Sequence, residues 1–174
     1  SRNTSKNSPP FSYPGNKRSM KRQFLFFILL VSSIICLYGQ AELTGPVTKE
    51  AILQKCADWQ PIAAAYNPKP EYIERLRGLT REVRIEIFLG AWCSDSKAHV
   101  SEYFKILEMA DTPLIQTSFM AVPEDKTKRA VFYQGKDIQK IPTFIIFIDG
   151  LEKGRIIEVP TKSVEEDLVE IIER

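Results

Sequence analysis

The sequence predicts an α/β fold in which a mixed β-sheet lies between helical layers, as a three-layer α/β/α sandwich. Two observations support this fold class. Residues 83–122 show a strand, a helix and a second strand in succession, and such a succession folds as a right-handed parallel crossover. Asp149-Gly150 is a hairpin signal after an apolar run, and it adds an antiparallel pair of strands at the C-terminal end.

Extra helices are expected ahead of the sheet. Residues 49–65 place apolar side chains near helical spacing, with Thr48 as the candidate N-cap. Pro61 lies inside this stretch and should kink or end the helix, because proline has no amide hydrogen to donate. Residues 71–79 form a second, shorter helical stretch.

The first half of the sheet follows. Residues 83–89 alternate and then become fully apolar, as a strand entering a buried sheet does. Residues 94–109 carry an apolar stripe at helical spacing, and residues 114–122 are a second strand. Residues 123–137 are polar and charged with little periodicity, so we expect a connection that holds a short helix.

The C-terminal part completes the fold. Residues 143–148 read T-F-I-I-F-I, a continuous apolar strand that should be central in the sheet. Residues 153–159 are the partner strand of the hairpin. A final helix follows, with Ser163 as the expected N-cap and Glu166 at the capping-box position.

The N-terminal region is typical of an export signal. Met20-Lys21-Arg22 is a short basic segment, residues 24–37 are apolar apart from two serines, and Gly39 is a small residue at the expected cleavage site. The apolar stretch is shorter than the ~20 residues of a spanning helix. We therefore expect cleavage and export to the periplasm or cell envelope, with an uncleaved membrane anchor as the alternative.

The domain organisation follows from this signal. We expect a disordered or non-native leader at residues 1–19, a signal peptide at residues 20–39, an N-terminal helical extension at residues 40–80 and the α/β domain at residues 81–174. Lipidation at Cys36 is an alternative to plain cleavage. The bulky Ile that precedes Cys36 fits a lipidation signal poorly.

Composition excludes several classes of function. Lys and Arg number 24 and Asp and Glu number 22, so the formal net charge is +2. A nucleic-acid binder normally has a strong basic excess, which this chain lacks. With one His and three Cys, a tetrahedral zinc site or a di-metal centre would be short of ligands. We expect no nucleic-acid partner, no metal and no cofactor.

Three separated motifs carry a family resemblance. Residues 91–96 read A-W-C-S-D-S between a strand and a helix, Ile141-Pro142-Thr143 opens a central strand, and residues 147–156 form a hairpin with glycines at 150 and 154. Together, in this order, they resemble the thioredoxin superfamily over residues 82–173. The resemblance implies a cis-proline at Pro142 that faces an active-site cysteine at Cys93.

The chain also departs from the family pattern. Ser96 stands where the W-C-x-x-C turn has its second cysteine, and Ile87 stands where many thioredoxins bury an aspartate. The sequence is most similar to exported bacterial thioredoxin-like proteins with a single-cysteine W-C-x-D-S turn. These departures remove the local resolving thiol and a proton acceptor.

The residues predict monothiol chemistry. Cys93 should lie at a helix N-terminus, where unpaired backbone amides and the helix dipole favour a thiolate. We expect Cys93 to be the catalytic nucleophile and the Ser96 hydroxyl to hydrogen-bond its sulfur. An external thiol would then resolve the mixed disulfide. Cys56 is the candidate internal resolving thiol, and a small apolar packing residue is its alternative interpretation.

Four residues are expected to bind substrate. Trp92 should offer an apolar platform, and the backbone at Ile141 and Pro142 should pair with an extended peptide, with Thr143 lining the groove. His99 should face away from the site as a surface residue, because it lies about 600° of helical turn beyond the cysteine.

Two functions remain open from the sequence. The first is an exported thiol-disulfide oxidoreductase that acts on protein or small-molecule disulfides with an external thiol reductant. The second is a redox-inactive module that binds peptides or proteins, and whether the chain is an enzyme therefore stays open. The membrane would be a partner only through an uncleaved signal segment. The basic run Lys126, Lys128 and Arg129 is interpreted as a solvated loop.

Overall fold

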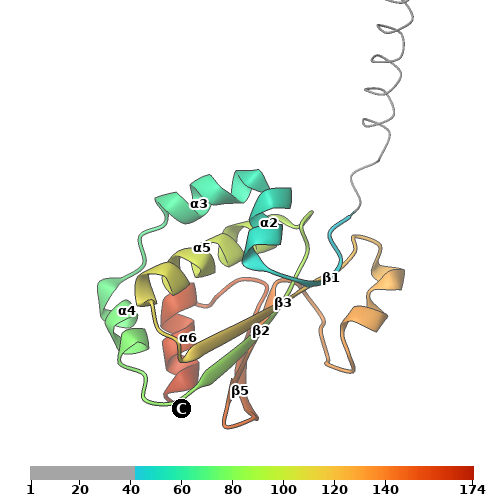
Figure 1. The fold of residues 1–174 in the computed structure, drawn as a ribbon. Helices are drawn as coiled ribbons and strands as arrows, with labels where there is room; N and C mark the ends of the chain where they lie inside the picture. The colour runs from blue at the N-terminus through green and yellow to red at the C-terminus, as the bar shows by residue number, and fades with distance from the viewer. Residues whose placement is uncertain (1–41) are drawn as a thin grey trace, which may run out of the picture. The chain divides into compact units, whose positions relative to one another are not determined.

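The computed structural model describes residues 42–174 (Figure 1). The expected leader, signal peptide and Cys36 lie outside the described residues. The elements are, in chain order, β1 (Gly45–Val47), α2 (Lys49–Lys55), the 3-10 turn η1 (Ala57–Trp59), α3 (Gln60–Ala65), α4 (Pro70–Arg77), β2 (Val83–Leu89), α5 (Ser94–Ala110), β3 (Ile115–Ala121), the 3-10 turns η2 (Lys126–Lys128) and η3 (Ala130–Phe132), β4 (Thr143–Ile148), β5 (Leu151–Ile157) and α6 (Val164–Ile172). No helix in this part of the chain is long and apolar enough to cross a membrane.

The five strands form one mixed sheet in the order β1-β3-β2-β4-β5. Strand β2 pairs in parallel with β3 and antiparallel with β4, and β4 and β5 form the C-terminal hairpin. The predicted fold class is confirmed. Strand β5 begins at Leu151, directly after the turn and earlier than expected. Strand β1 was not predicted, because Gly45 and Pro46 are poor strand residues.

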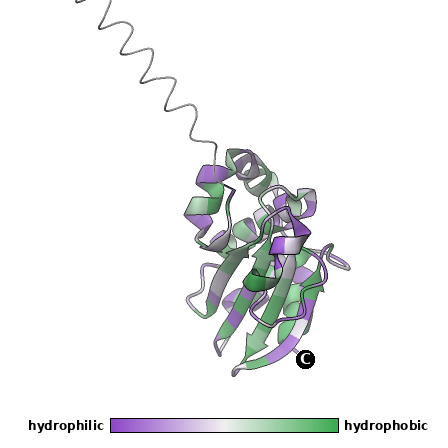
Figure 2. Ribbon diagram, turned by 90° about the vertical axis from the view of Figure 1, so that its right-hand side faces the viewer, coloured by the Kyte–Doolittle hydropathy of each residue, from purple (hydrophilic) through white to green (hydrophobic). Residues whose placement is uncertain are grey.

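The two faces of the sheet are covered differently (Figures 1 and 2). Helices α2 to α6 share one hydrophobic core with the side chains on one face, including Ile87. The other face buries a smaller cluster around Phe88, against which Phe132 and Tyr133 pack. This layer consists of loops and 3-10 turns where the predicted sandwich has α-helices, because residues 123–137 lack helical periodicity.

The N-terminal helices belong to the larger core. Ile52, Trp59 and Ile73 are buried and cluster with Phe104 of α5. The Thr48 side chain accepts the predicted N-cap hydrogen bond of α2. The stretch expected as one kinked helix is divided into α2, η1 and α3, with its proline in the first turn of α3, where no amide hydrogen is required.

Helix α6 begins without the predicted capping box. Ser163 occupies the N-cap position, but its side chain makes no capping hydrogen bond. The Glu166 carboxylate instead accepts a hydrogen bond from Lys69 Nζ at 2.5 Å and lies 3.2 Å from Lys162 Nζ. The Glu166 side chain, which the pattern assigned to the cap, therefore pairs with Lys69 and Lys162 instead.

Candidate functional site

Cys93 lies where the chain turns from β2 into α5. It is the N-cap of α5, with an extended backbone at φ −89° and ψ 126°. Its amide donates a hydrogen bond to the Gly90 carbonyl at 3.0 Å, which closes the turn. The side chain is half-buried. The sulfur therefore lies at the start of a 17-residue helix, where backbone amides and the dipole favour negative charge.

The loop before β4 brings the second motif to this sulfur. The Ile141–Pro142 peptide bond is cis, as the resemblance implies. Cys93 Sγ donates a weak hydrogen bond to the Ile141 carbonyl at 3.6 Å. Strand β4 runs antiparallel to β2 with Thr143 paired to Phe88, so the start of β4 lies beside the end of β2. Two motifs that are distant in the sequence therefore meet at one end of the sheet.

Trp92 forms a wall beside Cys93. Its Nε1 donates a hydrogen bond to the Val122 carbonyl at 3.1 Å, and the side chain is 38% exposed. Gly90 leaves room for the ring, because a Cβ there would lie 2.7 Å from Trp92 Cε2 and 2.9 Å from Ile141 Cδ1. The residue expected as a platform is thus an exposed aromatic side chain, packed closely against its neighbours.

Ser96 has a different partner from the expected one. The residue is fully buried in the first turn of α5, and its Oγ accepts a hydrogen bond from the Gly90 amide at 3.1 Å. Within the described part of the chain, the Ser96 hydroxyl does not form the expected hydrogen bond with Cys93 Sγ. The hydroxyl satisfies a buried backbone amide instead, so it fastens the turn that carries the cysteine.

Cys56 is buried, and both it and Cys93 are free cysteines. Burial raises the pKa of the Cys56 thiol, and the nearby Asp58 carboxylate raises it further. Lys97 of α5 forms an ion pair with Asp58 at 2.5 Å. A buried thiol with a raised pKa is a poor nucleophile, which favours the packing interpretation of Cys56 over the resolving one.

The backbone and side chains around Pro142 are already engaged. The Pro142 carbonyl accepts a hydrogen bond from the Glu158 amide at 2.7 Å. The Thr143 hydroxyl donates to the Lys140 carbonyl at 2.6 Å, and Thr143 is only 1% exposed. The prediction that Thr143 lines an open groove is therefore wrong, because its side chain points inward and holds the loop that carries Ile141.

Arg129 is a site residue that sequence reasoning missed. The solvated-loop interpretation holds for Lys126 and Lys128, which are exposed, but is wrong for Arg129, which is 8% exposed. Its guanidinium carbon lies 4.6 Å from the centre of the Trp92 ring. No local pattern signals this contact, because only the tertiary fold brings the two residues together.

Neither of two further positions supplies a proton acceptor at the cysteine. Ile87 is fully buried in the larger core. His99 Nδ1 lies 2.8 Å from Glu102 Oε2 on the same helix, and the His99 side chain is mostly buried rather than on the surface as expected. The chemistry of the site therefore depends on the sulfur, the helix N-terminus and the cis-proline loop.

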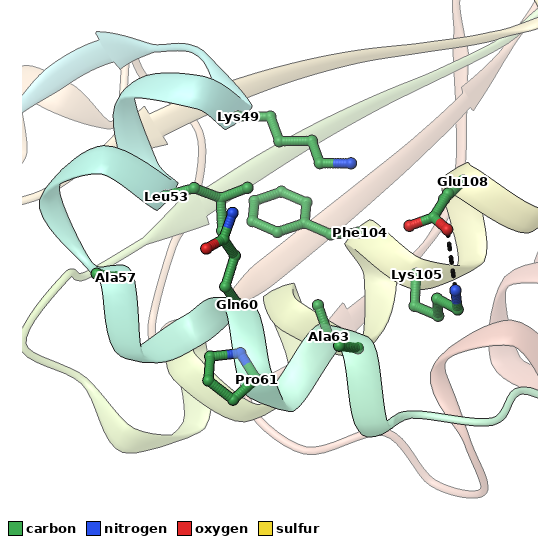
Figure 3. A pocket seen from close by; sticks show the side chains of 10 residues that line it. Lys49, Leu53, Ala57, Gln60, Pro61, Ala63, Phe104, Lys105 and Glu108 are labelled. Atoms are coloured by element: carbon green, nitrogen blue, oxygen red, sulfur yellow. Dashed lines mark hydrogen bonds and ion pairs between the residues drawn. The ribbon is translucent and has the colours of Figure 1, made fainter.

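A separate cavity of about 670 Å³ lies between α2, α3 and α5 (Figure 3). The Phe104 ring lines the cavity, and Lys49 Nζ lies 5.3 Å from the ring centre. Lys105 Nζ donates a hydrogen bond to Glu108 on the same helix. None of the predicted site residues lines this cavity. Among residues 42–174, no cluster of three His, Cys, Asp or Glu side chains could hold a metal ion.

Comparison with known proteins identifies the family and the fold. The thioredoxin family model matches residues 48–170. No curated protein matches the sequence. A Pseudomonas aeruginosa protein of unknown function is 16% identical with a TM-score of 0.51, over 78% of this chain and 87% of that chain. An HIV epitope scaffold is also 16% identical with a TM-score of 0.50, over 70% of this chain and 84% of that chain.

A thioredoxin from Trypanosoma brucei brucei is 20% identical with a TM-score of 0.39, over 58% of this chain and 86% of that chain. At 16% identity, the Pseudomonas aeruginosa protein and the epitope scaffold show the fold alone. The family model covers strands β2 to β5, the turn with Cys93 and the loop with Pro142. The chain belongs to the thioredoxin superfamily.

Proposed function

We propose that this protein is an exported thiol-disulfide oxidoreductase that acts through Cys93 alone. The observation that carries the proposal is the position of one sulfur. Cys93 Sγ is half-buried at the start of α5 and 3.6 Å from the carbonyl that precedes the cis-proline. A sulfur at this position lies at a helix N-terminus, where the helix dipole favours negative charge, and beside the cis-proline loop.

The reaction is a pair of thiol-disulfide exchanges. The Cys93 thiolate attacks one sulfur of a protein or small-molecule disulfide, forms a mixed disulfide with it and releases the other sulfur as a thiolate. An external thiol, as its thiolate, then attacks the mixed disulfide. This second exchange releases Cys93 as a thiolate and leaves the external thiol joined to the substrate sulfur, so each exchange consumes one thiolate and one disulfide and yields one of each.

An external thiol is needed because the described part of the chain offers no suitable internal one. Ser96 has no sulfur, and its hydroxyl is occupied by the Gly90 amide. Cys56 is buried, and its thiol has a raised pKa. The sequence of the leader supports export to the periplasm or cell envelope, where disulfides persist as substrates.

The test is a single-turnover assay with glutathione disulfide as the probe. The protein should gain one glutathionyl group on Cys93, and a small thiol should remove it. The Cys93→Ser variant should gain none at that position, while the Cys56→Ser variant should react as the wild type does. Failure of Cys93 to form the mixed disulfide, in a protein that is folded by circular dichroism, would contradict the proposal.

A redox-inactive binding module is the second candidate. The specific observation in its favour is that Ser96 and Ile87, both fully buried, replace the second thiol and the acidic group of the family pattern. The exposed Trp92 and the cis-proline loop remain in place without them. This candidate predicts that a peptide binds equally well to the wild type and to Cys93→Ser, and that no mixed disulfide forms.

A further inference from the structure

We propose that Arg129 is a positioning residue that holds the Trp92 indole in place beside Cys93, and so makes exchange with peptide disulfides faster than Cys93 alone would. The inference rests on the proposed thiol chemistry for its kinetic part. The position of the indole can be measured whether or not Cys93 performs the proposed thiol chemistry.

The environment of Arg129 is unusual for a cation. The residue is 8% exposed, and no carboxylate forms an ion pair with it within residues 42–174. Its Nε donates a hydrogen bond to the Pro123 carbonyl at 2.8 Å, and its Nη2 donates to the Glu124 carbonyl at 2.6 Å. A buried cation needs compensating partners. Here the described partners are two backbone carbonyls and the face of the Trp92 ring.

The indole is held by these same neighbours. The Arg129 guanidinium lies over the ring, the Val122 carbonyl accepts from the indole Nε1, and the ring lies close against Gly90. The carbonyls of residues 122, 123 and 124 are consecutive, so one short segment fixes both the indole and the guanidinium. The exposed part of Trp92 is therefore pre-organised next to the reactive sulfur.

Lysine cannot replace arginine in this role. The planar guanidinium donates from two of its nitrogens to the two carbonyls while its carbon lies over the indole, 4.6 Å from the ring centre. A lysine ammonium keeps the charge but has no flat face and cannot present the same fork of donors. Arg129→Lys should therefore lose much of the positioning, and Arg129→Gln should lose it further.

The kinetic consequence depends on the size of the partner. A peptide disulfide must lay its chain along the site and contact the Trp92 wall, whereas a small neutral disulfide reaches the sulfur without that wall. Loss of Arg129 should therefore slow exchange with a peptide disulfide and leave exchange with the small reagent nearly unchanged.

The experiment compares the wild type, Arg129→Lys and Arg129→Gln, with Lys128→Gln as the matched control. Lys128 is exposed in the same segment, and its ion pair with Asp125 is a surface contact. Acrylamide quenching of tryptophan fluorescence reports on Trp92, because the other tryptophan, Trp59, is 1% exposed. Rates of Cys93 modification are measured with a cystine-bridged model peptide and with 4,4′-dithiodipyridine.

We expect Arg129→Gln to increase quenching and to slow the peptide reaction about five- to tenfold, with less than about a twofold change for the small reagent. Arg129→Lys should be intermediate, and Lys128→Gln should match the wild type. Unchanged quenching in Arg129→Gln overturns the proposal, and so does an equal loss with both reagents. If wild-type Cys93 reacts with neither reagent, the proposed function fails, and the quenching alone then decides whether Arg129 positions Trp92.

Discussion

Gly90 illustrates how single residues determine the geometry of the site. Its carbonyl closes the turn with the Cys93 amide, its own amide donates to Ser96 Oγ, and its missing side chain leaves space for Trp92 and Ile141. Each contact involves a different neighbour, so one small residue links Cys93, the buried Ser96 and the exposed Trp92. A side chain at position 90 should disturb the packing of all of them.

The first prediction is that Gly90→Ala displaces the Trp92 ring. The added Cβ would lie 2.7 Å from Trp92 Cε2 and 2.9 Å from Ile141 Cδ1, so these side chains must shift. We expect a loss of about 1–3 kcal/mol in the free energy of unfolding, measured by urea denaturation. Gly78→Ala is the matched control, because its Cβ would be no closer than 3.4 Å to its neighbours. Equal effects of the two substitutions would contradict the steric account.

The second prediction concerns Ser96→Cys. The introduced thiol would stand one turn from Cys93 at the helix N-terminus, so it should displace a bound substrate sulfur without an external thiol. Without an external thiol, the reduced Ser96→Cys variant should therefore reduce an insulin disulfide in a single turnover and form its own disulfide, whereas the wild type should stay joined to insulin as a mixed disulfide. Stability should fall by about 1 kcal/mol, because sulfur is a weaker acceptor for the Gly90 amide.

Two outcomes would count against this account of Ser96. Insulin reduction by the wild type without an external thiol would mean that another group of the chain resolves the mixed disulfide. A stable Ser96→Cys variant whose two thiols never form a disulfide with each other would mean that the turn does not have the geometry of the family's two-cysteine site.

At the scale of elements, α6 is fastened to the segment between α3 and α4. Glu165 accepts hydrogen bonds from the Tyr66 hydroxyl at 2.7 Å and from the Lys69 amide at 3.1 Å. Glu166 pairs with Lys69 and Lys162. The hydrogen bond from Lys69 is the main cause that lowers the pKa of Glu166 to about 2, and a hydrogen bond from Tyr72 adds to it. The carboxylate is therefore favoured strongly in the folded state.

The third prediction is a loss of stability in acid that depends on Glu166. Because the folded pKa is lowered from 4.5 to about 2, the stabilisation is present above the higher value and is lost as the pH falls toward the lower one. Between about pH 5 and about pH 3, the urea midpoint of the wild type should fall more than that of Glu166→Gln.

Glu173→Gln is the control for this prediction. Glu173 forms an ion pair with Arg75 of α4, but both side chains are about half exposed, so the pair should contribute little. Its acid dependence should resemble that of the wild type. A Glu166→Gln variant with the same acid dependence as the wild type would show that the two lysines do not stabilise the fold through this carboxylate.

At the scale of the whole molecule, the sequence predicts those strands and turns that a local residue pattern specifies. The run T-F-I-I-F-I specifies a buried central strand by itself, and the turn signal at Asp149-Gly150 specifies the hairpin. Strand β1 escapes such reasoning, because its residues form a strand only through pairing with β3. The partners of Ser96 and Thr143 escape it too, since a hydroxyl can bond many groups and the fold decides which one lies in reach.

Arg129 shows the same limit for a charged residue. In the sequence it is one of three basic residues in a polar run, and charge alone predicts exposure. The fold places it against Trp92 because residues 123–140 cover the sheet face with the smaller cluster, against which Cys93 also packs. Predicting the site in full would therefore have required the long-range packing of that connection.

The most direct test of the central claim is the rate of alkylation of each cysteine in the native protein. Iodoacetamide is applied at about pH 6, and the modification of Cys93 and of Cys56 is followed by mass spectrometry of the peptides. Cys93 should be alkylated much faster, because its sulfur is reachable at a helix N-terminus while Cys56 is buried with a raised pKa. Equal rates for the two thiols in the folded protein would contradict the account.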